Sequence, residues 1–310
     1  MRGLELSEAF FKEYGEPMLK DRFPSLLPHI AVGLLGAGSE CYGFDDEISR
    51  DHDFDASFCV FLPDEDTVSR KEAFRLEREL AALPREFMGQ KRMALAPTGG
   101  ARRGVLRLSD FLLEKTGTPD GDLSVRDFFF LPETALAEVT NGKVFFDGAG
   151  TLTSVRHRLS YLPEDVRRKK LAGALLLMGQ AGQYNYPRSL ARGDTAAAQL
   201  AVIEFVKHAL HSILLLRKTY LPYYKWQFRA LAKVSPLSEA LEYLISSPND
   251  KKTAKEKTAC IAEVATAVCG LLFTEGLSAR EDDNLEAHAY AVNDAVASPE
   301  IRNLHILYGV

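Results

Sequence analysis

The sequence has few cysteines, and none of them are paired at a metal-binding spacing. Only four occur among the 310 residues, with no CxxC motif and no histidine pair at zinc-finger spacing. Structural zinc sites and disulfide frameworks both need such pairs. We therefore predict no zinc site, no disulfide framework and four reduced thiols, most of them buried: Cys41, Cys59, Cys260 and Cys269.

We expect neither a membrane-spanning apolar run nor a secretory leader in this sequence. No uninterrupted stretch approaches the roughly 20 apolar residues that span a bilayer. The first residues, MRGLELSEAFFKEYG, are amphipathic and lack the apolar centre of a signal peptide. We accordingly expect no membrane segment and a cytoplasmic location.

The charge is moderate in total but uneven along the chain. The net charge is −5, with 46% hydrophobic and 26% charged residues, as is typical of a folded globular protein. Residues 45–66 hold nine acids and one arginine, 85–107 hold six basic residues and one glutamate, and 156–170 hold six basic residues and two acids. These runs fit either solvated faces or an acidic metal site opposite phosphate-binding segments. The acidic total disfavours a long nucleic acid as partner, because such binding needs basic surface.

The hydrophobic pattern changes character between residues 150 and 160. Before this point, short apolar runs and helical spacings predict four strands and three helices. The strands are expected at 30–35, 51–62, 104–108 and 144–147, and the helices at 7–20, at 69–83 with a Ser69–Glu72 capping box, and from 110. After it, the pattern predicts helices alone, at 164–182, 194–219, 223–233, 237–246, 254–274 and 282–297. We therefore predict an α+β protein with two domains, 1–153 and 154–310.

The stretch 36–55, GAGSECYGFDDEISRDHDFD, combines a small-residue turn with three alternating aspartates. In an extended strand, Asp51, Asp53 and Asp55 would share one face. Three carboxylates so close repel one another unless a cation neutralises them, and Mg²⁺ prefers carboxylates together with water and substrate phosphate. The turn with Gly38 and Ser39 offers backbone N–H groups and a hydroxyl to phosphate. The pattern therefore predicts a metal-assisted phosphate site.

The same residues resemble the nucleotidyltransferase superfamily related to DNA polymerase beta and kanamycin nucleotidyltransferase. Its signature is a Gly-Ser after a strand and then Asp-x-Asp running into an apolar strand, which Gly38-Ser39 and Asp51-His52-Asp53 match with eleven residues between them. The string GSECYGFDDEISRDHD and the later YLPYYKW at 220–226 look like a bacterial branch described mainly as a domain of unknown function. The resemblance implies a small mixed sheet flanked by helices, followed by an all-helical bundle.

The resemblance also implies a reaction: transfer of a nucleoside monophosphate, with AMP from ATP as the first choice, to a hydroxyl acceptor with release of pyrophosphate. Asp51 and Asp53 would hold Mg²⁺ or Mn²⁺. The nucleotide would be bound by Gly38, Ser39, Ser49 and Lys225. The acceptor is left open between a small molecule, a tRNA and a protein, and so is the oligomeric state.

The sequence departs from the superfamily pattern at the position expected to supply the general base. Relatives often add a third carboxylate from a later strand, but the corresponding strand here offers Arg107. Asp55 shares the face of the other two aspartates and could replace it, and Asp53-x-Asp55 is an alternative frame for the motif. Asp194 and Glu204 are further candidates from the helical half.

Other interpretations of the same letters have less support. His52-Asp53 could indicate an HD-type phosphohydrolase, and Asp53-Phe54-Asp55 a haloacid-dehalogenase nucleophile, but neither context fits. Arg107 also leaves room for a catalytically inactive nucleotide-binding regulatory module, and a toxin or its silencer is a third possibility. Arg188 and Arg192 are expected in a loop that could meet phosphate. His208 and His211 are interpreted as ordinary helix residues.

Overall fold

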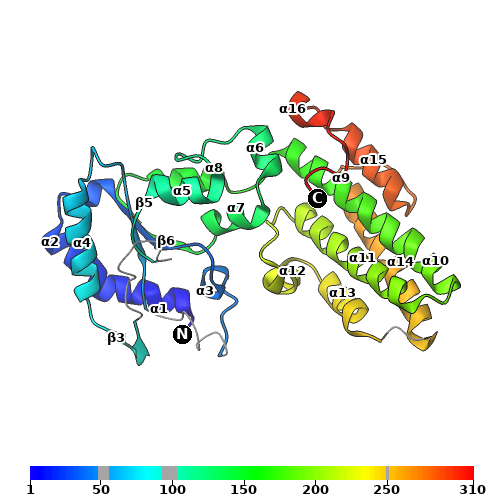
Figure 1. Ribbon diagram of the computed structural model, residues 1–310, viewed down its shortest axis with the longest axis horizontal. Helices are drawn as coiled ribbons and strands as arrows, with labels where there is room; N and C mark the ends of the chain where they lie inside the picture. The colour runs from blue at the N-terminus through cyan, green and yellow to red at the C-terminus, as the bar shows by residue number, and fades with distance from the viewer. Residues whose placement is uncertain (48–55, 93–102, 249–250) are drawn as a thin grey trace. The chain divides into compact units, whose positions relative to one another are not determined.

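The structure is a computed structural model that describes residues 1–47, 56–92, 103–248 and 251–310. The described chain divides into two compact units (Figure 1). Unit 1 contains residues 1–123 and 134–160, and unit 2 contains residues 124–133 and 161–310. The segment 124–133 thus belongs to unit 2, although residues 134–160 of unit 1 follow it in the sequence. The predicted single boundary at 153 does not include this crossing of the chain between the units.

Unit 1 is built on a small mixed sheet in the order β5-β2-β1-β6. Strand β1 pairs antiparallel with both β2 and β6, whereas β2 and β5 are parallel. The expected small mixed sheet in a protein of helices and strands is confirmed. The strands are β1 (Ala31–Leu34), β2 (Cys59–Leu62), β5 (Gly104–Arg107) and β6 (Lys143–Asp147), and a separate hairpin consists of β3 (Glu86–Phe87) and β4 (Gln90–Lys91).

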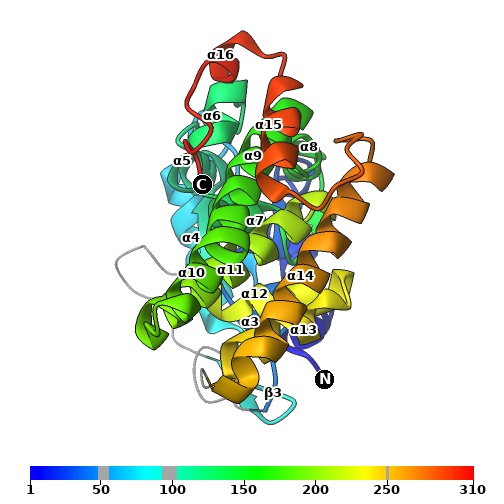
Figure 2. The ribbon, with the colours of Figure 1, turned by 90° about the vertical axis from the view of Figure 1, so that its right-hand side faces the viewer.

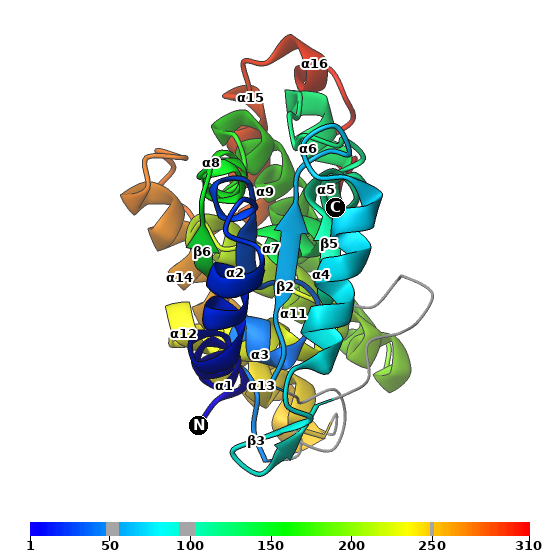
Figure 3. The ribbon, with the colours of Figure 1, turned by 90° about the vertical axis from the view of Figure 1, so that its left-hand side faces the viewer.

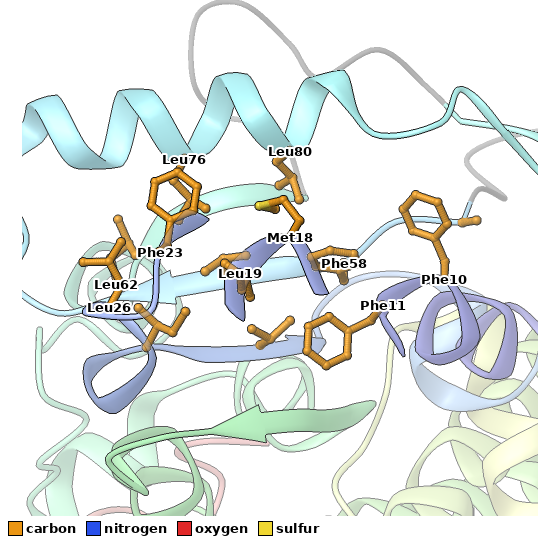
Figure 4. Packing of buried hydrophobic residues seen from close by; sticks show 14 of the residues in the cluster. Phe10, Phe11, Met18, Leu19, Phe23, Leu26, Phe58, Leu62, Leu76 and Leu80 are labelled. Atoms are coloured by element: carbon orange, nitrogen blue, oxygen red, sulfur yellow. The ribbon is translucent and has the colours of Figure 1, made fainter. Parts of the chain in front are cut away.

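One face of the sheet is covered by the first helices and by α4 (Figure 3). Aromatic side chains dominate this core, where Phe10 and Phe11 contact Phe58 with ring centroids 6.0 and 5.2 Å apart (Figure 4). A Cβ atom on Gly15 would lie 2.5 Å from the Phe58 ring, so glycine allows this close packing. The helix expected at 7–20 begins earlier and contains a π-helical turn. Its parts are α1 (Gly3–Phe10), η1 (Phe11–Gly15) and α2 (Glu16–Arg22), followed by the short η2 (Leu27–His29).

Helix α4 (Arg70–Ala82) confirms the predicted capping box. The Glu72 N–H donates to the Ser69 hydroxyl at 3.3 Å, and the Ser69 N–H donates to the Glu72 carboxylate at 3.1 Å. Leu76 and Leu80 point from α4 into the core (Figure 4). The opposite face of the sheet packs Phe61 against Phe111 and includes Leu152. The remaining helices that contribute residues to unit 1 are α3 (Ser39–Tyr42), α5 (Leu108–Thr116), α7 (Glu133–Thr140) and α8 (Thr151–Arg158).

The described part of unit 2 consists of helices and their connections, without strands. Helices α9, α11 and α14 lie side by side, and α15 packs on α9 (Figure 2). The expected helical character of the C-terminal half is confirmed. Its elements are α6 (Val125–Phe130), α9 (Glu164–Gly179), the π-helical η4 (Gln180–Asn185), α10 (Tyr186–Ala191), α11 (Thr195–Leu216), η5 (Tyr224–Trp226), α12 (Gln227–Val234), α13 (Leu237–Ser246), α14 (Lys251–Thr274), α15 (Leu285–Asp294) and α16 (Pro299–Arg302).

The prediction of a loop around Arg188 is wrong, because this residue lies in α10. Pro187 occupies the first turn of that helix, where proline is tolerated because its missing N–H would have no helical partner. The Arg188 guanidinium stacks on the Tyr184 ring, 4.7 Å from its centroid, and donates to the Tyr184 hydroxyl at 2.8 Å. Arg192 follows directly after the helix.

Within the described residues, two helices are long and apolar enough to cross a membrane by length and composition alone. They are Thr195–Leu216 and Thr253–Thr274, and scattered polar residues hid them from a search for uninterrupted runs. The apolar window of the first is 67% buried within the protein. The apolar window of the second is 39% buried. Mostly buried core helices of soluble proteins have the same character as the first helix.

The four cysteines are free thiols, as predicted. Cys41, Cys59 and Cys269 are buried, and Cys260 is partly exposed. Burial raises the pKa of Cys59 to about 12. Thiols with such high pKa values are poor nucleophiles at neutral pH, so these cysteines are packing residues.

Candidate active site

The turn after β1 is held in place by one asparagine of unit 1. Gly36 has a φ angle of +107°, a backbone conformation that favours glycine. The Asn141 side chain accepts the Gly36 N–H at 3.0 Å and donates to the Gly36 carbonyl at 2.8 Å. The predicted phosphate-binding turn is therefore present as a fixed loop, with Gly38 as the N-cap of the short helix α3 and Ser39 as its first residue.

Gly142 contacts the backbone on both sides of the same turn, at Cys41 and at Leu34. Its N–H donates to the Cys41 carbonyl at 2.8 Å, and its φ angle is +62°. A Cβ atom there would lie 1.9 Å from the Leu34 carbonyl oxygen at the end of β1. Only glycine fits between these two backbone segments.

Gly142→Ala is therefore expected to destabilise unit 1 by more than about 1 kcal/mol, because alanine disfavours this φ angle and also collides with backbone. Urea denaturation followed by circular dichroism measures the change. Gly117→Ala is the matched control, since Gly117 has a φ angle of +77° but open space around its Cβ position. Equal destabilisation by both variants would show that the close approach to Leu34 contributes nothing.

Strands β1 and β2 bring the Gly-Ser turn and the entry to β2 to one end of the sheet. Gly33 pairs with Cys59 in the antiparallel register, so the chain enters β2 beside the point where it leaves β1. The turn that follows β1 and residues 56–58 that precede β2 therefore lie at the same sheet end. The aspartates of the motif come immediately before residue 56 in the sequence.

Four of the predicted site residues lie outside the described residues: Asp51, Asp53, Asp55 and Ser49. Elsewhere in the chain, the described residues contain no group of three or more histidine, cysteine, aspartate or glutamate side chains placed to hold a metal ion. Metal binding by Asp51 and Asp53 thus stays a prediction.

Arg103 connects the turn to the entry of β2, a link that the sequence analysis missed. Its Nη2 donates to the Glu40 carboxylate at 2.5 Å and its Nη1 donates to the Ser57 hydroxyl at 2.9 Å. The Arg103 and Glu40 side chains are 13% and 9% exposed. One guanidinium therefore contacts the residue after Ser39 and the second residue after Asp55.

Arg107 has a structural role in the described fold. Its Nη1 donates to the carbonyls of Pro63 and Asp64 at 2.7 and 3.1 Å, which fixes the chain as it leaves β2. No carboxylate stands on β5, whose residues are Gly, Val, Leu and Arg. The third acid of the superfamily pattern is accordingly missing from this strand.

Both alternative candidates for the general base, Asp194 and Glu204 of unit 2, have partners in the structure. The Asp194 carboxylate accepts the Ala197 N–H at 3.0 Å as the N-cap of α11. Glu204 pairs with Lys207 at 3.0 Å and with His208 at 3.3 Å, and these partners contribute to a lowered pKa of the Glu204 carboxyl. A lowered pKa makes a weaker base, so neither residue gains support.

Lys225 lies in unit 2, exposed within the 3₁₀ turn η5. Its Nζ is 4.7 Å from the centroid of the Trp226 ring, and the guanidinium of Arg229 is 5.4 Å from the same centroid. Tyr223 and Tyr224, with ring centroids 4.5 Å apart, are exposed beside it. Phosphate binding by Lys225 remains a prediction.

A buried contact between a carboxylate and an imidazole anchors the segment that leads to Lys225. The His211 ring contacts the Glu133 carboxylate at 2.8 Å, and the other carboxylate oxygen accepts the Leu221 N–H at 3.0 Å. Burial raises the pKa of Glu133, but His211, the charge of Lys170 and the Leu221 N–H together outweigh this effect, and the pKa lies below its ordinary value. His211 is therefore more than an ordinary helix residue. No spacing rule links two residues 78 positions apart, so no sequence pattern indicated this pair.

A pocket of about 950 Å³ opens beside the turn in unit 1. It runs from Gly36 and Ala37 along β5, between α4 and α5. Its volume is in the range of small-molecule sites. Among its lining residues, Lys115 bridges Glu114 and Glu138 at 2.9 and 2.8 Å.

One family model matches part of the chain. The family described as a domain of unknown function, DUF4037, matches residues 128–227, which is less than half of the chain. No curated protein matches the chain. The matched range contains Glu133, His211 and the segment 220–226, so the buried anchor of this segment lies within the part that is similar to that family.

Proposed function

We propose that the protein is a metal-dependent nucleotidyltransferase that transfers AMP from ATP to a hydroxyl acceptor. The observation that carries the proposal is the common position of the Gly-Ser turn and the entry to β2 at one end of the sheet, linked through Arg103. A phosphate-binding turn and a carboxylate-bearing strand must meet in this way for metal-assisted phosphoryl chemistry.

The proposed reaction is an in-line displacement at the α-phosphorus of ATP. The acceptor oxygen forms a bond to this phosphorus, the bond between the α-phosphorus and the bridging oxygen breaks, and pyrophosphate leaves with that oxygen. The acceptor proton passes to a carboxylate, for which we propose Asp55. When bound by Asp51 and Asp53, Mg²⁺ supplies charge neutralisation and Lewis-acid activation. Gly38 and Ser39 hold the β- and γ-phosphates, and Ser49 and Lys225 are further nucleotide contacts in this proposal.

The proposal is tested by incubating the purified protein with each of four α-labelled nucleoside triphosphates and Mg²⁺ or Mn²⁺, with a cell extract as acceptor pool. We expect label to move from ATP to one extract fraction, and the class of that fraction identifies the acceptor. The Asp51→Asn, Asp53→Asn double variant is the control. Label that moves equally with both proteins would overturn the assignment.

A second candidate is a nucleotide-binding regulatory module without transfer activity. The engagement of Arg107 with two carbonyls, on the strand where relatives place an acid, favours it. This module would bind ATP with Mg²⁺ and lose that binding in the double variant, yet would transfer no label to any acceptor fraction. Calorimetry of ATP binding beside the labelling assay separates the two functions.

A further inference from the structure

Strand β5 is at one edge of the main sheet, and its outer side is open. It pairs with β2, and no other described strand pairs with it. The Gly104 N–H donates to the Phe58 carbonyl at the entry to β2, at 3.3 Å. Successive residues of a parallel strand bond alternately to its two sides, so the N–H and carbonyl of Val105 and the N–H of Arg107 face away from β2. The outer edge therefore presents backbone groups that a further strand can bond.

The pocket of about 950 Å³ follows this edge, with α4 on one side of β5 and α5 on the other (Figure 1). Val105 contributes to the core on the α4 side, and Leu106 packs with Phe111 of α5 on the opposite side. Each wall of the pocket carries an aromatic ring, Phe74 on α4 and Phe111 on α5, and Phe74 is 62% exposed. An extended chain in this groove would bond to β5 and pack its side chains on both walls.

The walls of this β5 groove are acidic. Its lining holds five carboxylates and three cations. The three cations all have partners: Arg70 on Glu65, Lys115 on Glu114 and Glu138, and Arg107 on two backbone carbonyls. The other two carboxylates, Glu77 of α4 and Asp110 of α5, have no ion-pair partner in the part of the chain that the structure describes. One uncompensated negative charge on each wall favours a cationic occupant.

We propose that the β5 groove binds an extended, basic segment of a partner protein as an added strand. Backbone hydrogen bonds to Val105 supply affinity for any extended chain, and side-chain contacts supply the preference for a basic one. Successive side chains of a strand point to opposite faces, so each wall receives every second residue of the segment. Apolar side chains pack on Phe74 and Phe111, and lysine or arginine side chains reach Glu77 and Asp110. This docking is independent of the proposed AMP transfer.

The same charges disfavour a second copy of this chain as the occupant. Two copies that paired through their β5 edges would bring the acidic walls of both grooves together. Like charges placed opposite each other in an interface weaken it. A basic partner segment has the opposite effect, because it neutralises Glu77 and Asp110 while it covers the open edge.

Fluorescence anisotropy with the labelled peptide KKVVKK tests the proposal, because this peptide presents lysine, valine and lysine to each wall when extended. We expect saturable binding at low ionic strength, where surface charges are least screened. The acidic peptide EEVVEE should bind about 10-fold more weakly or less. KKVVKK that does not bind, or binds no better than EEVVEE, would overturn the proposal.

Strand pairing is tested separately with two N-methylated forms of KKVVKK, one methylated at the odd positions and one at the even positions. Only alternate N–H groups of an added strand face β5. One form should therefore lose binding while the other retains it. Equal binding by the parent peptide and both forms would show that charge alone attracts the peptide, and would overturn the added strand.

The double variant Glu77→Lys, Asp110→Lys leaves three carboxylates and five cations in the groove. We expect its Kd for KKVVKK to rise by about 10-fold or more and its Kd for EEVVEE to fall by a similar factor. Tighter binding of EEVVEE cannot result from misfolding. The matched control is Glu13→Lys, Asp21→Lys, which reverses two exposed carboxylates outside the groove and should keep the preference for KKVVKK. An unchanged preference in the groove variant, or an equal reversal in the control, would overturn the assignment to this groove.

Discussion

Asp51→Asn is expected to lower the rate of AMP transfer by about a thousand-fold or more. Metal ligation supplies several kcal/mol of transition-state stabilisation, and a loss of about 4 kcal/mol corresponds to about a thousand-fold in rate. Asp53→Asn should have a similar effect, because both carboxylates are predicted to hold the metal. The rate of label transfer from ATP at saturating Mg²⁺ is the measurement.

The control for this prediction is Asp66→Asn, which removes an exposed carboxylate from the same acidic run after β2. It should retain the rate of the unmodified protein. All three variants should keep the circular dichroism spectrum, since the substitution is nearly isosteric. Transfer that persists in both Asp51→Asn and Asp53→Asn would remove the metal from the mechanism.

Glu133→Ala is expected to destabilise unit 2 by about 1–3 kcal/mol or more, the usual effect of leaving buried hydrogen-bonding groups without their partner. The variant would leave His211 without its carboxylate and the Leu221 N–H without its acceptor. Trp226, the sole tryptophan, lies in unit 2, so its fluorescence during urea denaturation reports this unit. Glu204→Ala is the control, because its carboxylate is half exposed and such pairs contribute about 1 kcal/mol or less.

The contribution of Glu133 should also depend on pH. The pKa of this carboxyl is lowered in the folded protein from its ordinary value of 4.5, so the folded state binds fewer protons than the unfolded state near that pH. Its stabilisation is therefore present above pH 4.5 and is lost as the pH falls through the folded-state pKa. A Glu133→Ala effect that stays constant from neutral pH to well below 4.5 would contradict this assignment.

Local signals account for the elements that the sequence predicted. The Ser69–Glu72 capping box and the short apolar runs of β1 and β6 depend only on neighbouring residues, and all three elements are present. Helix α6 has a similar capping box, Ser124 with Asp127, but its three consecutive phenylalanines show no single-face period and concealed the helix. The π-helical turns η1 and η4 have no sequence pattern that would distinguish them from α-helix.

Long-range pairs could not be predicted from the sequence. Arg103 and Glu40 are 63 residues apart, and Glu133 and His211 are 78 apart. Such contacts depend on sheet order and helix packing, which no local pattern specifies. The turn with Gly38 and Ser39 was predicted and is present, whereas the aspartate half of the motif lies outside the described residues.

Residues 124–133 belong to unit 2 although residues of unit 1 follow them, so their contacts with the end of the chain can form only late in synthesis. Phe129 packs on Gly309, and the backbone N–H of Arg126 donates to Glu300 at 3.2 Å. These partners emerge from the ribosome about 170 residues later than the segment itself. At a synthesis rate of roughly 5–20 residues per second, about ten seconds or more pass between the synthesis of α6 and that of these partners. Its phenylalanines are therefore exposed to other hydrophobic surfaces while unit 1, whose residues extend to 160, can already form.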